Sequence, residues 1–177
     1  MEKFLVHYKD MNVPDKIGEY LKEHMKGRTA IVCIGTDKCI IDCLGPLTGT
    51  FLLEKNISAD VYGTLTDPVH ALNIHRIVKL IDKKKYDTVI ALDACLTSSK
   101  KIGAIEIASG SIFPGKAIGK NLPKVGDISI IGVMEEVEID FKLLMNIVRL
   151  SFVYEMAQIL SSGIVLAEEK VKKNKLA

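Results

Sequence analysis

Two aspartates, Asp42 and Asp93, are the residues of this sequence best suited to acid-base chemistry. Asp93 ends an apolar run, so we expect its carboxyl group to be only partly solvated and to hold its proton more tightly than in water. Asp42 lies at the start of a predicted helix, where free amides and the helix dipole favour the ionised form. Such a pair can hydrolyse an amide, because one carboxylate activates a water and one carboxylic acid hydrogen-bonds the carbonyl oxygen. The same pair could instead hold a divalent metal ion that activates the water.

Both aspartates also have simpler interpretations. Asp42 can be a plain helix cap, and Asp93 can be a turn residue at the end of a strand. The spacing of the residues alone leaves these alternatives open.

Four further residues are predicted to bind substrate: Gly35, Thr36, Asp67 and His70. Asp67 and His70 can equally be the cap and first turn of the helix that follows them. If the strand before them lies beside the first apolar strand, His70 can approach Asp42 and Asp93. It could then act as a metal ligand, an orienting group or a proton shuttle.

Strands and helices alternate through the part of the chain that must position these residues. Apolar runs predict strands at 29–34, 59–65, 87–92, 103–108 and 127–133. Amphipathic periodicity predicts helices at 14–26, 44–54, 69–84 and 139–168, the last of them interrupted near 161–163. This alternation predicts a three-layer α/β/α protein with a mostly parallel mixed sheet. Ligands of such sheets bind at the carboxyl ends of the strands, where both aspartates are expected.

A long segment at 109–126, rich in Gly and Lys, separates the last two predicted strands. Loops of this length are often functional, so it could form a lid over a substrate, or it could be an ordinary solvated loop. An anion bound by Lys116 and Lys120 would indicate a small-molecule hydrolase or phosphorylase that uses the same crevice.

Composition indicates one globular domain over residues 1–177, with a helical segment at 1–27 and a frayed basic tail at 170–177. The formal net charge of +2 is too small to indicate a nucleic-acid or membrane partner. The N-terminal residues lack the pattern of a signal peptide, so we expect a cytoplasmic protein whose four cysteines are thiols. Apolar residues at helical spacing in the last helix can pack on the sheet or form the seam of a homo-oligomer.

Three ordered motifs resemble the sporulation proteins of the YyaC type, a family regarded as spore proteases of endospore-forming bacteria. They are Ile34-Gly35-Thr36-Asp37 with Asp42-Cys43-Leu44-Gly45-Pro46, then Tyr62-Gly63-Thr64-Leu65-Thr66-Asp67-Pro68-Val69-His70-Ala71-Leu72-Asn73, then Ala91-Leu92-Asp93-Ala94-Cys95-Leu96. The resemblance is close over about residues 30–133 and looser over the last helix.

That family resembles the spore germination protease and, more distantly, the hydrogenase maturation proteases, which have a phosphorylase/hydrolase-like fold. In those relatives an acid after the first strand and an Asp ending a later strand form the active site or metal site, and Asp42 and Asp93 match these positions. Here Ile41 precedes Asp42 and Cys43 follows it, which departs from the usual Gly-Asp-x-Leu-Gly-Pro form. The resemblance implies a sporulation-associated endopeptidase acting on small spore proteins, or a binding or regulatory protein on the same fold.

Overall fold

The computed structural model describes residues 3–97, 102–115, 122–135 and 148–176 of the chain. Within these residues, six strands form one sheet in the order β1-β5-β6-β4-β2-β3. The strands are β1 (Phe4–His7), β2 (Thr29–Cys33), β3 (Asp60–Tyr62), β4 (Thr88–Leu96), β5 (Ala104–Ser109) and β6 (Ile128–Glu135). The helices are α1 (Val13–Lys22), α2 (Leu44–Glu54), α3 (Ile74–Lys84), α5 (Leu150–Leu176) and the 3₁₀ turn η1 (Ile41–Cys43).

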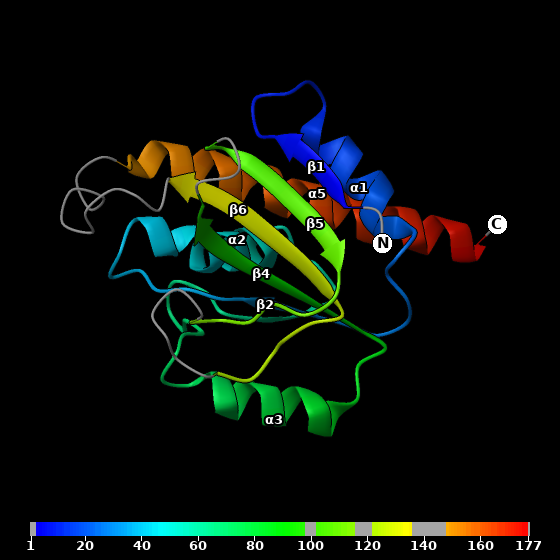
Figure 1. The fold of residues 1–177 in the computed structure, drawn as a ribbon. Helices are drawn as coiled ribbons and strands as arrows, with labels where there is room; N and C mark the ends of the chain where they lie inside the picture. The colour runs from blue at the N-terminus through cyan, green and yellow to red at the C-terminus, as the bar shows by residue number, and fades with distance from the viewer. Residues whose placement is uncertain (1–2, 98–101, 116–121, 136–147, 177) are drawn as a thin grey trace.

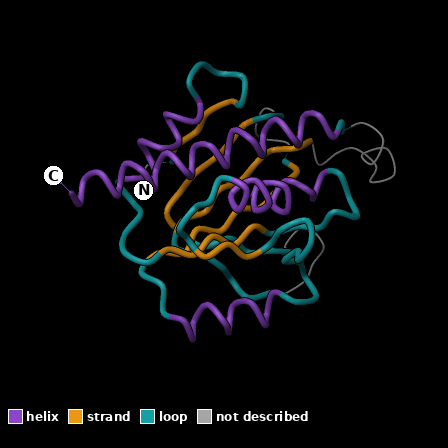
Figure 2. Tube along the Cα trace, turned by 180° about the vertical axis from the view of Figure 1, so that it is seen from behind, coloured by secondary structure: helices purple, strands orange, loops and turns teal. Residues whose placement is uncertain are grey.

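Helices cover both faces of the sheet (Figures 1 and 2), as the alternation of strands and helices predicts. The helices α1, α2 and α5 lie on one face, and α3 lies on the other. The buried side chains accordingly form two clusters, a larger one beneath the three helices and a smaller one beneath α3. The prediction of a three-layer α/β/α protein is confirmed.

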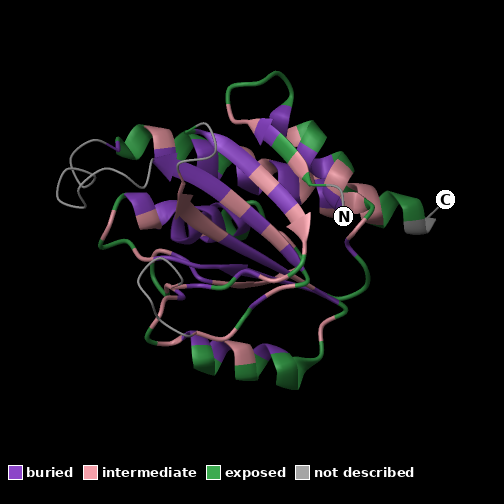
Figure 3. Ribbon diagram, in the orientation of Figure 1, coloured by how far each residue is buried: buried purple, intermediate pink, exposed green. Residues whose placement is uncertain are grey.

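The four adjacent strands β6, β4, β2 and β3 run parallel to one another. The strand β5 is antiparallel to β6, and β1 is antiparallel to β5. The carboxyl ends of β2 and β4 therefore meet at one edge of the sheet. The strand β2 is buried along its whole length, whereas β4 is buried only up to Leu92 and half-buried from Asp93 to Leu96. Figure 3 shows the buried residues gathered along the sheet and the exposed ones on the outer side of α3.

Several element boundaries differ from the sequence-based expectation. The segment at 1–27 is not wholly helical, because it begins with β1, which pairs with β5. The expected helix at 69–84 starts only at Ile74, since residues before it form a turn. The strand expected to stop before Asp93 continues to Leu96, because β4 keeps its pairing with β6 past Asp93.

The last helix, α5, is continuous through residues 161–163, so the expected interruption was wrong, and it extends to Leu176, beyond the expected end at 168. Packing explains the continuity, because Ser161 and Gly163 are buried and an added Cβ at Gly163 would lie 2.6 Å from Ile17 of α1. By length and composition alone, Leu150–Asn174 could cross a membrane. In this structure it packs along α1 and α2 as a core helix. The start of the expected helix, at 139–147, lies outside the described residues.

Candidate active site

Backbone hydrogen bonds at the end of β2 join the loop that leaves β2 to strand β4 on one side and to the turn before α3 on the other. The amide of Ile34 donates to the carbonyl of Leu92 at 2.7 Å, and the amide of Gly35 donates to the carbonyl of Val69 at 2.8 Å. The residues that follow these two carbonyls are Asp93 and His70. Asp93 and His70 are thus held on the two sides of the loop that leaves β2.

Asp42 joins this group through the same loop. The amide of Thr36 donates to the backbone oxygen of Asp42 at 3.0 Å. Gly35 makes this approach feasible, because its φ is +144° and an added Cβ would lie only 2.0 Å from that same oxygen. At Gly45, in the first turn of α2, an added Cβ would lie 2.0 Å from the backbone oxygen of Ile34. Close backbone contacts therefore press the turn that carries Asp42 against the end of β2.

Asp93 lies on the α3 face of β4, at the point where β2 stops. The register of β2 with β4 ends at Leu92, so beyond it Asp93 is paired only with Ile131 of β6. Its neighbours Leu92 and Ala94 face the opposite core. Burial and the negative charge of Asp42 raise the pKa of Asp93 well above its usual value, although its oxygen Oδ1 accepts a 2.9 Å hydrogen bond from the Ala94 amide. The expectation that Asp93 holds its proton tightly agrees with this environment.

Asp42 differs from the expectation in one respect. It is not a helix cap, because Cys43 occupies the cap position of α2 and makes no side-chain capping bond, while Asp42 lies in η1. Burial raises the pKa of Asp42 above its usual value, and the positive charge of His70 and a hydrogen bond from the Thr36 backbone oppose that increase. The interpretation that Asp42 is ionised by a helix terminus was therefore wrong. The nearby positive group and the backbone donor favour the ionised form of Asp42, but burial has the larger effect on its pKa and opposes them.

Electrostatic interactions link the three groups into one cluster, since the charge of His70 acts on Asp42 and the charge of Asp42 acts on Asp93. We refer to Asp42 and Asp93 as the acid pair. Asp93, which is affected by both burial and a like charge, is the member that keeps its proton to higher pH.

His70 is oriented by a residue that the sequence analysis did not select. The side chain of Asn73 accepts a 2.9 Å hydrogen bond from the His70 amide and donates a 2.8 Å bond to the carbonyl of Pro68. Asn73 precedes α3 but makes no capping bond to it, because its side chain closes the turn around His70 instead. Asn73 lies three residues after His70 and directly before an apolar helical repeat, and this position was the sequence signal that could have predicted a turn-closing side chain.

The remaining predicted site residues lie around this cluster. Gly35 is buried and Thr36 is half-buried, both in the loop that contacts Asp42. Asp67 is exposed, and its backbone makes reciprocal hydrogen bonds with Thr64 in the turn before Val69. Asp67 is therefore a turn residue in this structure and not the cap of α3. The binding roles assigned to these residues stay predictions, and Lys116 and Lys120 lie outside the described residues.

The described residues were examined for a group of side chains that could complete a metal site with the acid pair. In the part of the chain that the structure describes, no three or more His, Cys, Asp and Glu side chains are grouped so that they could hold a metal ion. The four cysteines form no disulfide, and Cys33 and Cys43 are buried, as expected for structural cysteines. Burial raises the pKa of the Cys33 thiol to about 12, which makes it a poor ligand.

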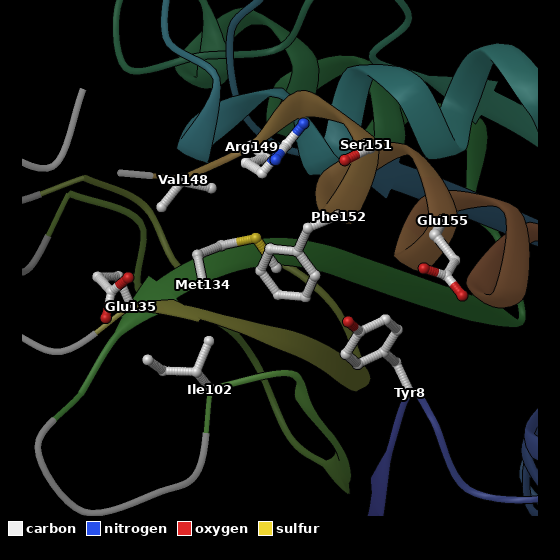
Figure 4. A pocket seen from close by; sticks show the side chains of 9 residues that line it. All are labelled: Tyr8, Ile102, Met134, Glu135, Val148, Arg149, Ser151, Phe152 and Glu155. Carbon is white, nitrogen blue, oxygen red and sulfur yellow. The ribbon is translucent and has the colours of Figure 1, made fainter. Parts of the chain in front are cut away.

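A pocket of about 300 Å³ lies elsewhere, on the α5 face beyond the end of β6 (Figure 4). Met134 and Phe152 lie near its centre, with Glu135 toward one end and Glu155 toward the other. Its lining residues are Tyr8, Ile102, Met134, Glu135, Val148, Arg149, Ser151, Phe152 and Glu155. None of them was predicted as a site residue, and Met134 belongs to the core cluster of the face opposite Asp93.

The fold and the cluster together define an α/β/α protein with paired carboxyl groups at the carboxyl edge of its parallel strands. The chain belongs to the family described as a protein of unknown function, DUF1256, whose model matches residues 5–163. It is 40% identical over 140 residues to the uncharacterized protein YyaC of Bacillus subtilis (strain 168). That match covers 78% of this chain and 68% of the relative, so the resemblance found in the motifs is confirmed.

Solved structures with a similar arrangement include two [NiFe] hydrogenase maturation proteases of Thermococcus kodakarensis. HycI, from strain KOD1, has a TM-score of 0.45 and 18% identity, covering 82% of this chain and 98% of that one. HybD has a TM-score of 0.39 and 16% identity, covering 76% of this chain and 99% of that one.

Proposed function

We propose that this protein is an endopeptidase that acts on proteins of the spore in the cytoplasm of the sporulating cell, with the acid pair as its catalytic centre. The observation that supports the proposal is the placement of two carboxyl groups, 51 positions apart in the numbering of the chain, at one edge of the sheet, where the charge of Asp42 acts on Asp93 and the two environments are unequal. Two carboxyl groups whose pKa values differ can divide the acid and base roles of amide hydrolysis.

The reaction assigns one proton-transfer role to each residue. Asp42, as the carboxylate, takes a proton from a water molecule, and the water oxygen bonds to the peptide carbonyl carbon. Asp93, as the carboxylic acid, donates a hydrogen bond and then its proton to the carbonyl oxygen. As the C–N bond breaks, Asp42 returns its proton to the leaving amine, and the new carboxylic acid returns the other proton to Asp93. The products are one carboxyl and one amino terminus.

The test of this proposal is the appearance of new peptide termini. Purified full-length protein is incubated with acid-soluble proteins extracted from spores, and new N-termini are identified by mass spectrometry. We expect defined cleavage sites with the wild type and none with the double variant Asp42→Asn/Asp93→Asn.

The single variant Asp82→Asn is the matched control, since Asp82 is exposed on α3. It should cleave as the wild type does. Equal cleavage by the wild type and the double variant would contradict the assignment of the acid pair. No cleavage by any of the three proteins would favour a binding or regulatory role on the same fold.

The proposed mechanism also predicts a bell-shaped dependence of cleavage on pH. Activity needs one proton on the acid pair, so it falls at low pH when Asp42 is protonated and at high pH when Asp93 is ionised. Because burial and the charge of Asp42 raise the pKa of Asp93 well above its usual value, the descending limb should lie well above pH 4. Initial rates on one cleaved peptide across the pH range measure both limbs. A rate that only rises with pH would contradict a protonated Asp93.

A further inference from the structure

The backbone groups of β4 point alternately toward its two neighbouring strands. The carbonyl of Leu92 accepts a 2.7 Å hydrogen bond from the amide of Ile34, so Leu92 faces the β2 side. The amide of Thr97 donates to the carbonyl of Glu135 at 3.1 Å, so Thr97, just past the end of β4, faces β6. Because the direction alternates along a strand, even-numbered residues of β4 face the β2 side and odd-numbered ones face β6.

Beyond Leu92, β4 is paired on one side only. Its register with β2 ends at Leu92, whereas its register with β6 continues to Leu96, and the two strands end side by side (Figure 1). The register shift in that ladder skips Met134 of β6, so β4 itself stays regular. Ala94 and Leu96 therefore direct their amide and carbonyl groups to the side that β2 has left. Within the described residues, no strand pairs with them on that side.

The surroundings of Ala94 agree with an unpaired strand edge. Its amide donates to Oδ1 of Asp93 at 2.9 Å, so a side chain takes the place of a strand carbonyl. The loop that leaves β2 turns toward the other side, because the amide of Gly35 donates to the carbonyl of Val69. The last four residues of β4 are half-buried, so solvent reaches this part of the strand. We refer to the outward backbone groups of Ala94 and Leu96 as the open edge.

We propose that the open edge binds an extended segment of the substrate protein as an added strand. The complement of a row of backbone donors and acceptors is another extended backbone, and peptides add to sheet edges in this way. The open edge begins at the residue after Asp93, so a strand added there runs directly past the acid pair. This inference rests on the proposed function, because it names the form in which that same site takes its substrate.

The open edge therefore selects the conformation of the substrate. A helix cannot pair with it, because the amides and carbonyls of a helix are bonded to one another. An unfolded stretch of chain offers both groups at every second residue, whatever its side chains are. We expect the protein to act on unfolded segments and to leave helical and folded segments intact.

Hydrogen exchange in the unmodified protein, followed by NMR, tests whether the edge is open. The amide of Leu96 should exchange about ten times faster than the amide of Thr97, which is bonded to Glu135. The two amides are neighbours in the chain, so fraying of the strand end affects both. Equal exchange rates would overturn the proposal.

Peptide binding is measured on the double variant Asp42→Asn/Asp93→Asn, which should leave the probes uncut. The probes are short overlapping synthetic peptides that cover the acid-soluble proteins of the spore extract. We expect some of them to bind and to slow the exchange of the Leu96 amide. N-methylation of a bound peptide should weaken binding roughly fivefold at alternate residues and have little effect between them. Failure of every peptide to protect Leu96, or an effect without alternation, would overturn the proposal.

The variants Leu96→Pro and Leu96→Ala, made in the same double variant, isolate one amide of the open edge. Both remove a side chain that packs on the larger core cluster, but only proline removes the amide. That amide faces away from β6, so proline breaks no bond of the β4–β6 ladder. Peptides should bind the proline variant roughly fivefold more weakly than the alanine variant, and equal affinities would overturn the proposal. The N-methylation series gives the same decision on a chain that keeps Leu96.

These measurements separate the open edge from the proposed function. Peptides that protect the Leu96 amide but are never cleaved by the wild type would contradict the endopeptidase and support the open edge. Cleavage of peptides that leave this amide unprotected would contradict the open edge and support the endopeptidase.

Discussion

Asp93→Asn should abolish peptide cleavage and, at neutral pH, increase the free energy of unfolding. Loss of one acid-base group lowers the rate of such reactions by about 10²- to 10⁴-fold. Asparagine keeps the shape of the side chain and the oxygen that accepts from the Ala94 amide. It lacks the ionisable proton, so it avoids the cost of placing a second negative charge beside Asp42.

The sign of the stability change follows from the raised pKa of Asp93. Between the ordinary aspartate pKa of about 4 and the higher value in the folded protein, the native state holds a proton that the unfolded chain has released. The free energy of unfolding of the wild type therefore decreases as pH rises through this interval, by up to about 1.4 kcal/mol per pH unit. The variant has no such decrease, which makes it the more stable protein at pH 7.

Urea denaturation at several pH values between 4 and 8 measures this difference, and the cleavage assay is run on the same samples. Asp82→Asn, on the exposed side of α3, should follow the wild-type curve. Parallel stability curves for the wild type and Asp93→Asn would contradict a protonated Asp93. Retained cleavage in a well-folded Asp93→Asn protein would contradict its role as the acid.

Gly35→Ala should destabilise the protein strongly and separate the acid pair. The added Cβ would lie 2.0 Å from the backbone oxygen of Asp42 and 3.0 Å from Cδ of Pro46, so η1 and the start of α2 must move. The positive φ of +144° adds strain of its own. We expect the displaced Asp42 to act less on Asp93, so that the pKa of Asp93 decreases toward its usual value.

Gly110→Ala is the matched control for this prediction. Gly110 also has a positive φ, +122°, but an added Cβ there meets nothing within 4 Å. Backbone strain alone should cost about 1–2 kcal/mol at either position. The forced movement at Gly35 should add about 1–3 kcal/mol more. Equal losses in urea denaturation, or an unchanged Asp93 titration in Gly35→Ala, would show that this contact does not hold Asp42 in place.

The sequence predicted the layers and the edge of the sheet that carries the acid pair, because apolar runs and helical periodicity depend on local composition. It misplaced the end of β4, since a polar Asp93 resembles a strand end. In the structure the strand goes on, because β6 continues to pair with it while β2 has stopped. Which neighbour ends first is a property of the assembled sheet, and the local pattern does not contain it.

The environment of Asp42 was harder to predict for a similar reason. Its position before a helix suggested a cap, whereas Asp42 lies in η1, within range of the charge of a histidine that is 28 positions later in the numbering. The strand β1 was missed because its four residues alternate only weakly in polarity. It becomes a strand by pairing with β5, which is nearly 100 residues away.

The side chains of β4 alternate between the two faces of the sheet, and this limits where residues can be inserted into the chain. Inserting one residue into β4 ahead of Asp93 would turn the carboxyl group through the sheet, toward the apolar core beneath α1, α2 and α5. One residue inserted between Thr36 and Asp42 would leave the side chains of every strand on their present faces of the sheet. It would change only the length of the loop that carries Asp42. Related sequences should therefore vary in length between the positions of Thr36 and Asp42 and keep a constant length in β4 ahead of Asp93.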